Sequence, residues 1–249
     1  MKIRAALGVI LLSLSAPSTA FADRSVVLLT SEYPPYHSET LPNQGILTQI
    51  VKEAFASSGY RVTFKFKPFA RTLQEGKADK VDGILSLWYS DERAKDFLYS
   101  DPLPANRIGF FARRGTRINY RELSDLSPYR IGVVRGYDNP EQIKEAGLEV
   151  EVTANDAQNI AMLVAGRLDL ALIDQHTGHF FLYKNHPDRV SEFTWLEPAL
   201  EERLQYVGFS KRAKDYMVIH RAFNRGLSKL RSNGRIEEIF KAQGYVEQR

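Results

Sequence analysis

The chain has no cysteine among its 249 residues. It therefore cannot form a disulfide, and it lacks the residue that lipid-anchored exported proteins need. A large excess of charge of one sign is also missing, since 32 basic and 30 acidic residues remain when Lys2 and Arg4 are set aside, a net charge of +2. That balance excludes the basic footprint of a nucleic-acid-binding protein. Neither a Gly-rich phosphate loop nor a G-x-S-x-G nucleophile elbow occurs.

The N-terminal residues are typical of a secretory signal peptide. Lys2 and Arg4 precede an apolar stretch, 6–14, and small residues follow up to the triplet Ala20-Phe21-Ala22. We expect cleavage after Ala22 rather than a membrane anchor, because the apolar stretch is shorter than the roughly 20 residues that span a bilayer. The exported protein is then expected to be soluble. Its remaining 227 residues, 249 less 22, predict one large or two modest domains.

Strand and helix patterns alternate through the first half of the chain. A short apolar strand at 26–30 runs into a loop at Pro34 and Pro35, where continued sheet pairing is impossible. Helical spacing of apolar residues follows Gly45, and alternation over 62–66 indicates another strand. A short helix at 72–76 and a strand at 81–87 complete the series. This order predicts an α/β fold with parallel strands.

The same pattern then restarts. Strands are expected at 130–134, 150–152 and 168–173, with one helix opening near Pro140 and another over 155–166. The segments Gly76–Gly83 and Gly166–Leu170 echo each other, each being a helix end that turns into a strand. An apolar helical stripe over 216–230, a turn at 232–234 and a last short helix follow. The chain is therefore predicted to consist of two similar halves.

Residues 88–103 resemble the T-x-E-R … F-S-x-P-Y signature of the family 3 extracellular solute-binding proteins. These proteins are the polar amino acid-binding components of ABC importers. Further matches span essentially the whole mature chain: Tyr33-Pro34-Pro35-Tyr36, 76–82, Gly136 before a helix, 166–174 and the turn at 232–234.

The resemblance implies two α/β lobes with a ligand cleft between them and two crossover segments, near 103–112 and 195–208. Lobe 1 would be discontinuous, comprising 23–107 and 205–249, and lobe 2 would comprise 108–204. It also implies a periplasmic monomer without a cofactor, which closes its hinge on a small polar ligand and delivers it to the membrane permease of an ABC importer.

Arg93, Asp174 and Arg71 are charged candidates for ligand contacts. Arg93 matches the arginine that in amino acid-binding members grips the ligand carboxylate with its planar, paired donors. Asp174 follows the strand 168–173, where the family places the carboxylate for the ligand ammonium; the alternative is a helix N-cap. Arg71 could add a second cationic contact, or it could be a solvated helix arginine.

Aromatic and hydroxyl residues complete the predicted lobe 1 wall. The resemblance aligns Tyr33 with a ring that stacks on the ligand and Tyr36 with a more structural one; packing across the proline bend is the alternative. Ser86, Trp88 and Ser90 fall on the segment that usually contacts the bound amino acid. Trp88 stands where a small hydroxyl residue is common, so it either narrows the pocket or stacks on a flat ligand.

The segment Gly136-Tyr137-Asp138 departs from the family pattern of a glycine and a Ser or Thr at a helix N-terminus. Tyr137 and Asp138 are candidate ligand contacts, and Asp138 could instead cap the helix that opens at Pro140. The departure argues against a simple amino acid as the ligand.

Two other classes of function stay open. An enzyme related to the periplasmic cyclohexadienyl or arogenate dehydratases would need a cleft acid or base, for which Glu32 and His37 are the nearest candidates, although neither stands in a catalytic motif. A metal site at His176 and His179 has suitable spacing but lacks a third ligand, so no metal is expected. A sensory role would require a separate membrane receptor.

Overall fold

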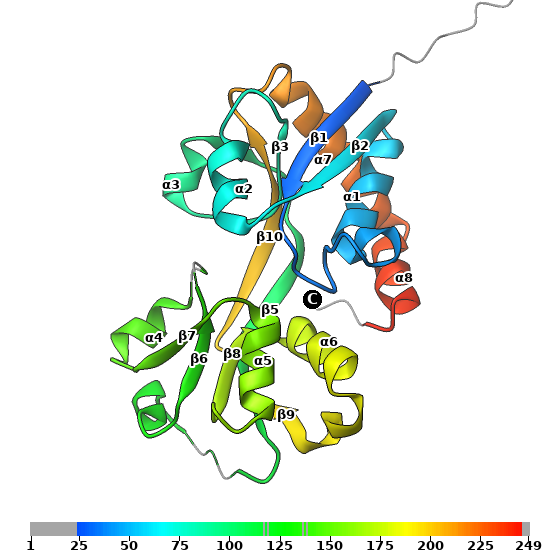
Figure 1. The fold of residues 1–249 in the computed structure, drawn as a ribbon. Helices are drawn as coiled ribbons and strands as arrows, with labels where there is room; N and C mark the ends of the chain where they lie inside the picture. Colours follow the sequence, from blue (N-terminus) through cyan, green and yellow to red (C-terminus); the bar gives the residue numbers. More distant parts are fainter. Residues whose placement is uncertain (1–23, 117, 119, 136, 138, 246–249) are drawn as a thin grey trace, which may run out of the picture.

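The computed structural model describes residues 24–116, 118, 120–135, 137 and 139–245. The predicted signal peptide at 1–22 and the candidates Gly136 and Asp138 lie outside the described residues. The chain forms two lobes, one above the other in Figure 1, with two long strands running between them. The expected two-lobed α/β class with crossover segments is confirmed.

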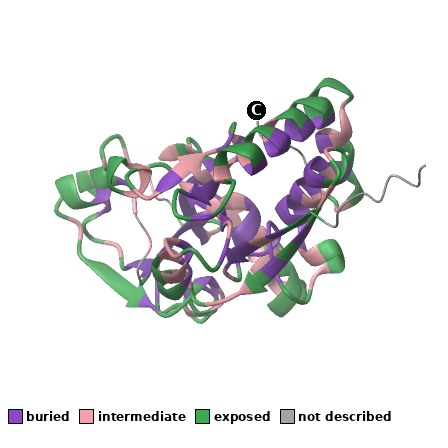
Figure 2. Cartoon of the chain, turned by 90° about the horizontal axis from the view of Figure 1, so that it is seen from above, coloured by how far each residue is buried: buried purple, intermediate pink, exposed green. Residues whose placement is uncertain are grey.

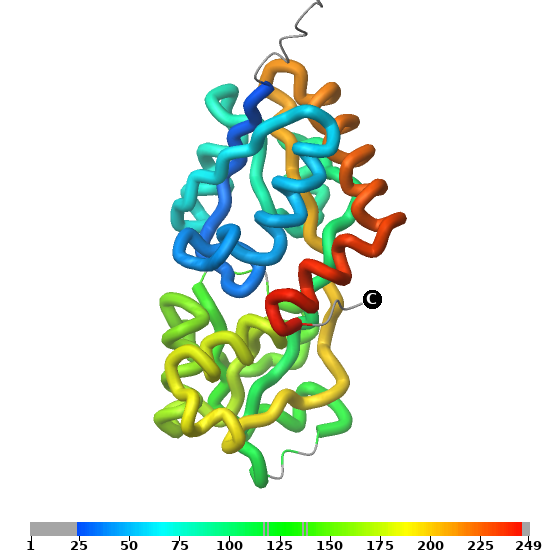
Figure 3. Tube along the Cα trace, turned by 90° about the vertical axis from the view of Figure 1, so that its right-hand side faces the viewer, coloured from blue at the N-terminus to red at the C-terminus, as the bar shows by residue number. Residues whose placement is uncertain are grey.

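Lobe 1 is built on three parallel strands with β1 in the middle: β2 (Tyr60–Phe66), β1 (Arg24–Thr30) and β3 (Gly83–Trp88). Its helices are α1 (Ile46–Ala56), α2 (Phe69–Gly76), α3 (Asp91–Ala94), α7 (Tyr216–Ser232) and α8 (Arg235–Ala242), with the 3₁₀ turn η1 (Pro42–Gln44) before α1. The two C-terminal helices return from lobe 2 to pack beside α1, as Figure 3 shows.

The packing of α7 on α1 depends on one glycine. A side chain at Gly226 would place its Cβ 1.9 Å from the carbonyl oxygen of Ala54. The helices can therefore approach this closely only because position 226 has no Cβ. Figure 2 shows the buried residues where the helices face the sheet.

Lobe 2 repeats the arrangement with β6 in the middle: β7 (Val150–Thr153), β6 (Ile131–Val134) and β8 (Leu170–Asp174). Its helices are α4 (Glu141–Glu145), α5 (Asp156–Val164) and α6 (Gln175–Asn185), with 3₁₀ turns η2 (Leu123–Leu126) and η3 (Pro187–Glu192). The similar segments Gly76–Gly83 and Gly166–Leu170 make equivalent backbone contacts in the two lobes. Asp82 accepts a hydrogen bond from the Val27 amide at 2.7 Å, and Asp169 accepts one from the Arg130 amide at 2.9 Å.

Two long antiparallel strands, β5 (Leu103–Arg113) and β10 (Glu201–Ser210), join the lobes into one sheet of order β2-β1-β3-β10-β5-β8-β6-β7. The short strands β4 (Phe97–Tyr99) and β9 (Phe193–Trp195) pair with β10 and β5. The predicted lobe boundaries at 107 and 205 fall within β5 and β10 and remain predictions. No helix of the described part of the chain is long and apolar enough to cross a membrane.

The fold brings the carboxyl ends of four strands to the region between the lobes. β1 ends at Thr30 and β3 at Trp88 in lobe 1, whereas β6 ends at Val134 and β8 at Asp174 in lobe 2. Ligands of α/β sheets bind beyond these ends, where loops replace regular structure. The loops that follow these four strands should therefore carry the site.

Candidate functional site

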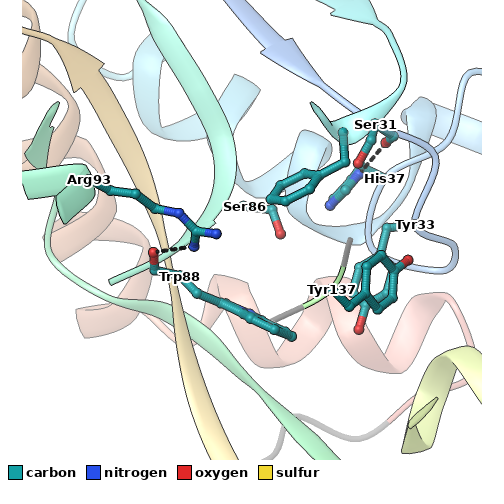
Figure 4. A pocket seen from close by; sticks show the side chains of 8 residues that line it. Ser31, Tyr33, His37, Ser86, Trp88, Arg93 and Tyr137 are labelled. Carbon is teal, nitrogen blue, oxygen red and sulfur yellow. Dashed lines mark hydrogen bonds between the residues drawn. The ribbon is translucent and has the colours of Figure 1, made fainter. Parts of the chain in front are cut away.

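A pocket with an empty volume of about 440 Å³ lies between the lobes. It is lined by Ser31, Tyr33, His37, Phe69, Ser86, Trp88, Arg93 and Tyr137, of which only Tyr137 belongs to lobe 2 (Figure 4). A second pocket of about 270 Å³ is lined by Tyr33, Trp88, Ile108, Tyr137, Asn139, Pro140, Leu172, Ile173 and Asp174. The two pockets share Tyr33, Trp88 and Tyr137, so these three aromatic side chains stand between the side of Arg93 and the side of Asp174.

Among the described residues that line the larger pocket, Arg93 is the one that is charged at neutral pH. Its Nη1 donates to the carbonyl oxygen of Trp88 at 3.0 Å, and its guanidinium lies 5.8 Å from the centre of the Phe69 ring. Arg93 forms no ion pair with any described residue. Its remaining N–H groups are therefore available to an anion inside the pocket.

Trp88 is fixed by polar contacts at its edge and its face. Its Nε1 donates to Oδ1 of Asn106 at 2.9 Å, and the Arg203 guanidinium lies 4.7 Å from its ring centre. The neighbouring Ser86 has a φ of 64° and donates its hydroxyl hydrogen to Gln205 on β10 at 2.5 Å. That backbone conformation is uncommon outside glycine, so the segment is held by its surroundings rather than by local preference.

His37 lies in the loop after β1 and is 2% exposed. Its Nδ1 is 2.6 Å from the carbonyl oxygen of Ser31 and 3.1 Å from the Thr30 hydroxyl. Burial lowers the pKa of His37 to about 4, so the ring is neutral at physiological pH. Its ring also lies against Tyr33, at 5.6 Å between centres.

Asp174 is 1% exposed and accepts four hydrogen bonds from this protein. Oδ1 accepts from the Thr177 amide at 2.9 Å, which makes Asp174 the N-cap of α6. Oδ2 accepts from the Tyr36 hydroxyl and the Asn106 side-chain amide, both at 3.1 Å, and from the Arg107 amide at 3.2 Å. Burial is the main reason that the pKa of Asp174 is raised.

Tyr36 connects the lobes through this carboxylate. It is fully buried, and its hydroxyl reaches both Asp174 and, at 3.2 Å, Nδ1 of His176 on α6. The Tyr33 ring stacks on Tyr36 at 5.5 Å and meets the edge of Tyr137 from lobe 2 at 6.1 Å. The lobes are thus in direct contact around the pocket.

Tyr137 covers a second buried carboxylate. Its hydroxyl donates to Oδ2 of Asp156 at 2.6 Å. Asp156 is 4% exposed, and no described residue donates to its Oδ1. Burial raises the pKa of Asp156 to about 7, with the charge of Asp174 adding to the shift.

Some sequence candidates do not reach the pocket. Ser90 caps α3 by accepting a hydrogen bond from the Arg93 amide at 3.3 Å, and Arg71 is exposed on α2. Neither lines either pocket. Glu32 is exposed and accepts from the Glu39 amide at 2.8 Å. The helix expected to open at Pro140 begins at Glu141, and Pro140 is its N-cap without a side-chain hydrogen bond.

The sequence also offered a histidine pair as a candidate metal site. His176 and His179 lie on α6 beside a groove that Tyr245 helps to line. No cluster of three or more metal-ligating side chains occurs within residues 24–245 as far as they are described.

Sequence reasoning missed Ser31 and Phe69 as pocket residues. It also missed Asn106 and Asp156, which accept hydrogen bonds from the pocket residues Trp88 and Tyr137. Phe69 opens α2 directly after Pro68, and Asp156 directly follows the N-cap Asn155. Those local patterns could have marked both residues as lying near strand ends, although not as neighbours of the pocket.

Comparisons with known proteins agree with this architecture. The family model of the bacterial extracellular solute-binding proteins, family 3, matches residues 26–243. The lysine/arginine/ornithine-binding periplasmic protein of Escherichia coli (strain K12) is 27% identical over 242 residues, covering 92% of this chain and 91% of that protein.

Solved structures with the same fold include binding proteins and a sensor. A histidine kinase sensor domain with similarity to periplasmic binding proteins has a TM-score of 0.74 at 21% identity, covering 91% of this chain and 99% of that one. The P235GK mutant of ArgBP from T. maritima has a TM-score of 0.71 at 19% identity, covering 88% and 94%. At these identities the likeness shows the fold alone.

Proposed function

This chain belongs to the family 3 bacterial extracellular solute-binding proteins, and from that premise we propose that it captures a small carboxylate-bearing zwitterion, an amino acid or a related compound, between its lobes. The observation that carries the proposal is Arg93, whose guanidinium has donors to offer in a pocket where the other described lining residues are uncharged at neutral pH. A planar guanidinium binds both oxygens of a carboxylate at once.

The lobe 2 side supplies the complementary charge. Asp174 lies across Tyr33, Trp88 and Tyr137 from Arg93, on the wall of the adjoining pocket. We propose that a ligand ammonium takes over the hydrogen bond that the Tyr36 hydroxyl makes to Oδ2 of Asp174. Because Arg93 and Asp174 belong to different lobes, a zwitterion that contacts both would favour the closed arrangement.

The ligands in the name of the E. coli relative narrow the class of ligand only in part. Lysine, arginine and ornithine share an α-carboxylate and an α-ammonium, and that shared part is what we carry over from the E. coli protein. The departures at Trp88, Tyr137 and Asp138 leave the rest of the ligand to be defined by this chain's own pocket.

The proposal extends to the steps of transport. Capture in the periplasm, hinge closure about β5 and β10, and delivery by a monomer to an ABC importer's permease are the steps we propose. We propose binding rather than a reaction, because the relative is named as a binding protein and Glu32 lies outside the pocket.

A ligand screen tests the proposal. Residues 23–249 are unfolded and refolded to remove bound ligand, and the thermal midpoint is measured against the twenty amino acids, dicarboxylates, polyamines and sugars. Ligand that binds only the folded protein raises the midpoint with concentration. A shift with a carboxylate zwitterion supports the proposal, and shifts confined to sugars or polyamines contradict it. Loss of prephenate or arogenate on incubation would instead establish the dehydratase alternative.

A further inference from the structure

His37 lines the pocket, yet neither the charge pair nor the aromatic wall accounts for it. Its Nδ1 lies 2.6 Å from the Ser31 carbonyl oxygen, and a carbonyl oxygen can only accept a hydrogen bond. In the neutral ring the hydrogen is therefore on Nδ1, and Nε2 carries a free lone pair. The tautomer is set by the backbone of the same loop.

The lone pair of Nε2 has no partner within this protein. Nε2 is buried, and no described residue donates a hydrogen bond to it. A buried acceptor without a donor costs free energy comparable to a lost hydrogen bond. Since the ring lines the pocket, a donor can come from a molecule inside the pocket.

The His37 ring is also uncharged. Burial holds the pKa of His37 at about 4, with the Ser31 carbonyl opposing the shift. The groups around it are the neutral Thr30 hydroxyl and the Tyr33 ring. His37 therefore offers an acceptor, and not a positive charge, over the physiological pH range.

His37 and Arg93 stand at different ends of the pocket. In Figure 4 the Arg93 guanidinium and the His37 ring lie on opposite sides of Ser86. Arg93 comes from α3 and His37 from the loop between β1 and α1. A ligand whose carboxylate meets Arg93 therefore reaches His37 with its far end.

We propose that His37 Nε2 is a specificity-determining acceptor, and that the ligand is an amino acid or related carboxylate whose side chain ends in a neutral hydrogen-bond donor, a hydroxyl or an amide. This inference rests on the proposed function, which supplies the carboxylate contact at Arg93. It concerns the distal end of the ligand, which Arg93 and Asp174 leave undefined.

Other distal groups fit less well for physical reasons. An apolar end leaves the Nε2 lone pair unpaired, and a carboxylate end sets two acceptors against each other. An ammonium or guanidinium end brings a second positive charge into a pocket in which Arg93 is already the charged group among the described lining residues. The hydroxyl or amide end alone satisfies Nε2 without burying another charge.

Matched ligand pairs test the acceptor role on the refolded wild-type chain. Tyrosine is compared with phenylalanine, glutamine with glutamate, and glutamine with arginine, each by calorimetric titration. In any pair that binds, we expect the donor-bearing neutral member to bind about 10-fold more tightly or better. Equal affinity within the pairs, or preference for the other member, overturns the inference.

Two substitutions at His37 separate the acceptor from the scaffold. His37→Asn can keep a donor for the Ser31 carbonyl but has no atom at the Nε2 position, whereas His37→Gln can place its amide oxygen there. We expect H37N to lose the preference within each pair and H37Q to retain part of it, and His186→Gln is the control away from the pocket. Equal behaviour of H37N and H37Q contradicts the inference.

A spectroscopic readout is independent of affinity. With ¹⁵N-labelled histidine, one of the five rings should show an unprotonated Nε2 whose signal moves when the donor-bearing ligand binds, and H37N should lack that signal. An unchanged signal on saturation overturns the inference while leaving the proposed function intact. If no carboxylate ligand binds the wild type at all, the proposed function and the inference fall together.

Discussion

The two walls of the cleft differ in how their polar groups are satisfied. On the lobe 1 wall, Arg93 has one hydrogen bond to a carbonyl oxygen, and His37 Nε2 has no donor from any described residue. On the lobe 2 wall, Asp174 accepts four hydrogen bonds and the Tyr137 hydroxyl is engaged with Asp156. Arg93 and His37 on the first wall therefore have hydrogen-bonding capacity left for a ligand. Asp174 and the Tyr137 hydroxyl on the second wall are already hydrogen-bonded within the protein.

This difference explains how one cleft can combine ligand capture with closure. A ligand can reach the lobe 1 groups without breaking any protein hydrogen bond, so lobe 1 is the wall that should bind first. A ligand ammonium that takes the place of the Tyr36 hydroxyl at Oδ2 of Asp174 exchanges one hydrogen bond for another, so this contact adds less net free energy than a contact to a group without a partner. Lobe 1 should thus determine affinity, and lobe 2 should determine the stability of the joined lobes.

The largest expected effect tests the lobe 2 side of this comparison. Asp174→Ala removes the acceptor that four donors share and removes the N-cap of α6. We expect the free energy of unfolding to fall by about 4 kcal/mol, measured by urea denaturation at pH 7. A loss below about 1 kcal/mol would show that these donors find other partners and would erase the contrast between the walls.

Arg93→Ala tests the other side. Removing the guanidinium should weaken binding of the carboxylate ligand about 100-fold, close to 3 kcal/mol, because its charge and paired donors are lost together. Unfolding should change by less than about 0.5 kcal/mol, since the side chain makes one hydrogen bond to the protein. Arg71→Ala, on the exposed face of α2, is the matched control. Unchanged affinity in R93A would remove the carboxylate role.

The contribution of Asp156 to the free energy of unfolding should depend on pH. Its pKa is about 7 in the folded protein against an ordinary value of 3.8, so the folded chain holds a proton that the unfolded chain releases. The contribution of this group to stability is full at low pH and is lost as the pH rises through 7. Between pH 5 and pH 8 the loss is about 2 to 3 kcal/mol.

Asp156→Asn isolates that contribution because the amide does not titrate. The difference in unfolding free energy, wild type minus variant, should fall by the amount just given between pH 5 and pH 8. His37 titrates in the opposite sense below pH 6.5, but it is present in both proteins and cancels. A difference that stays constant with pH would mean that Asp156 is ionised throughout this range.

The fold was accessible from the sequence because local patterns and global order agree. Strand alternation at 62–66 and the helical stripe at 216–230 fall within β2 and α7. The paired glycine-to-aspartate turns also predicted the repeat, and Asp82 and Asp169 perform the same backbone contact in each lobe. Such features depend on a few neighbouring residues, which is what a sequence displays.

The site was accessible only in part, because its contacts join residues far apart in the chain. Arg93 and Trp88 were found through a contiguous motif, and the structure brings both to the pocket. The bonds of Asp174 to Tyr36 and Asn106 cross 138 and 68 positions, and the lone pair of His37 depends on a loop carbonyl. No local pattern encodes these contacts, so Asp174 could be named but its saturation by four donors could not.

The smallest expected effect concerns the contact that joins the two walls. Tyr36→Phe removes one of the four donors to Asp174 and the contact with His176 while keeping the buried ring. We expect a loss of about 1 kcal/mol in urea denaturation, because three donors still satisfy the carboxylate. Tyr33→Phe is the matched control, since the Tyr33 hydroxyl has no hydrogen bond to any described residue, and should change stability by less than about 0.5 kcal/mol. If both variants behave alike, the Tyr36 hydroxyl does not hold the lobes together, and ring packing alone explains their contact.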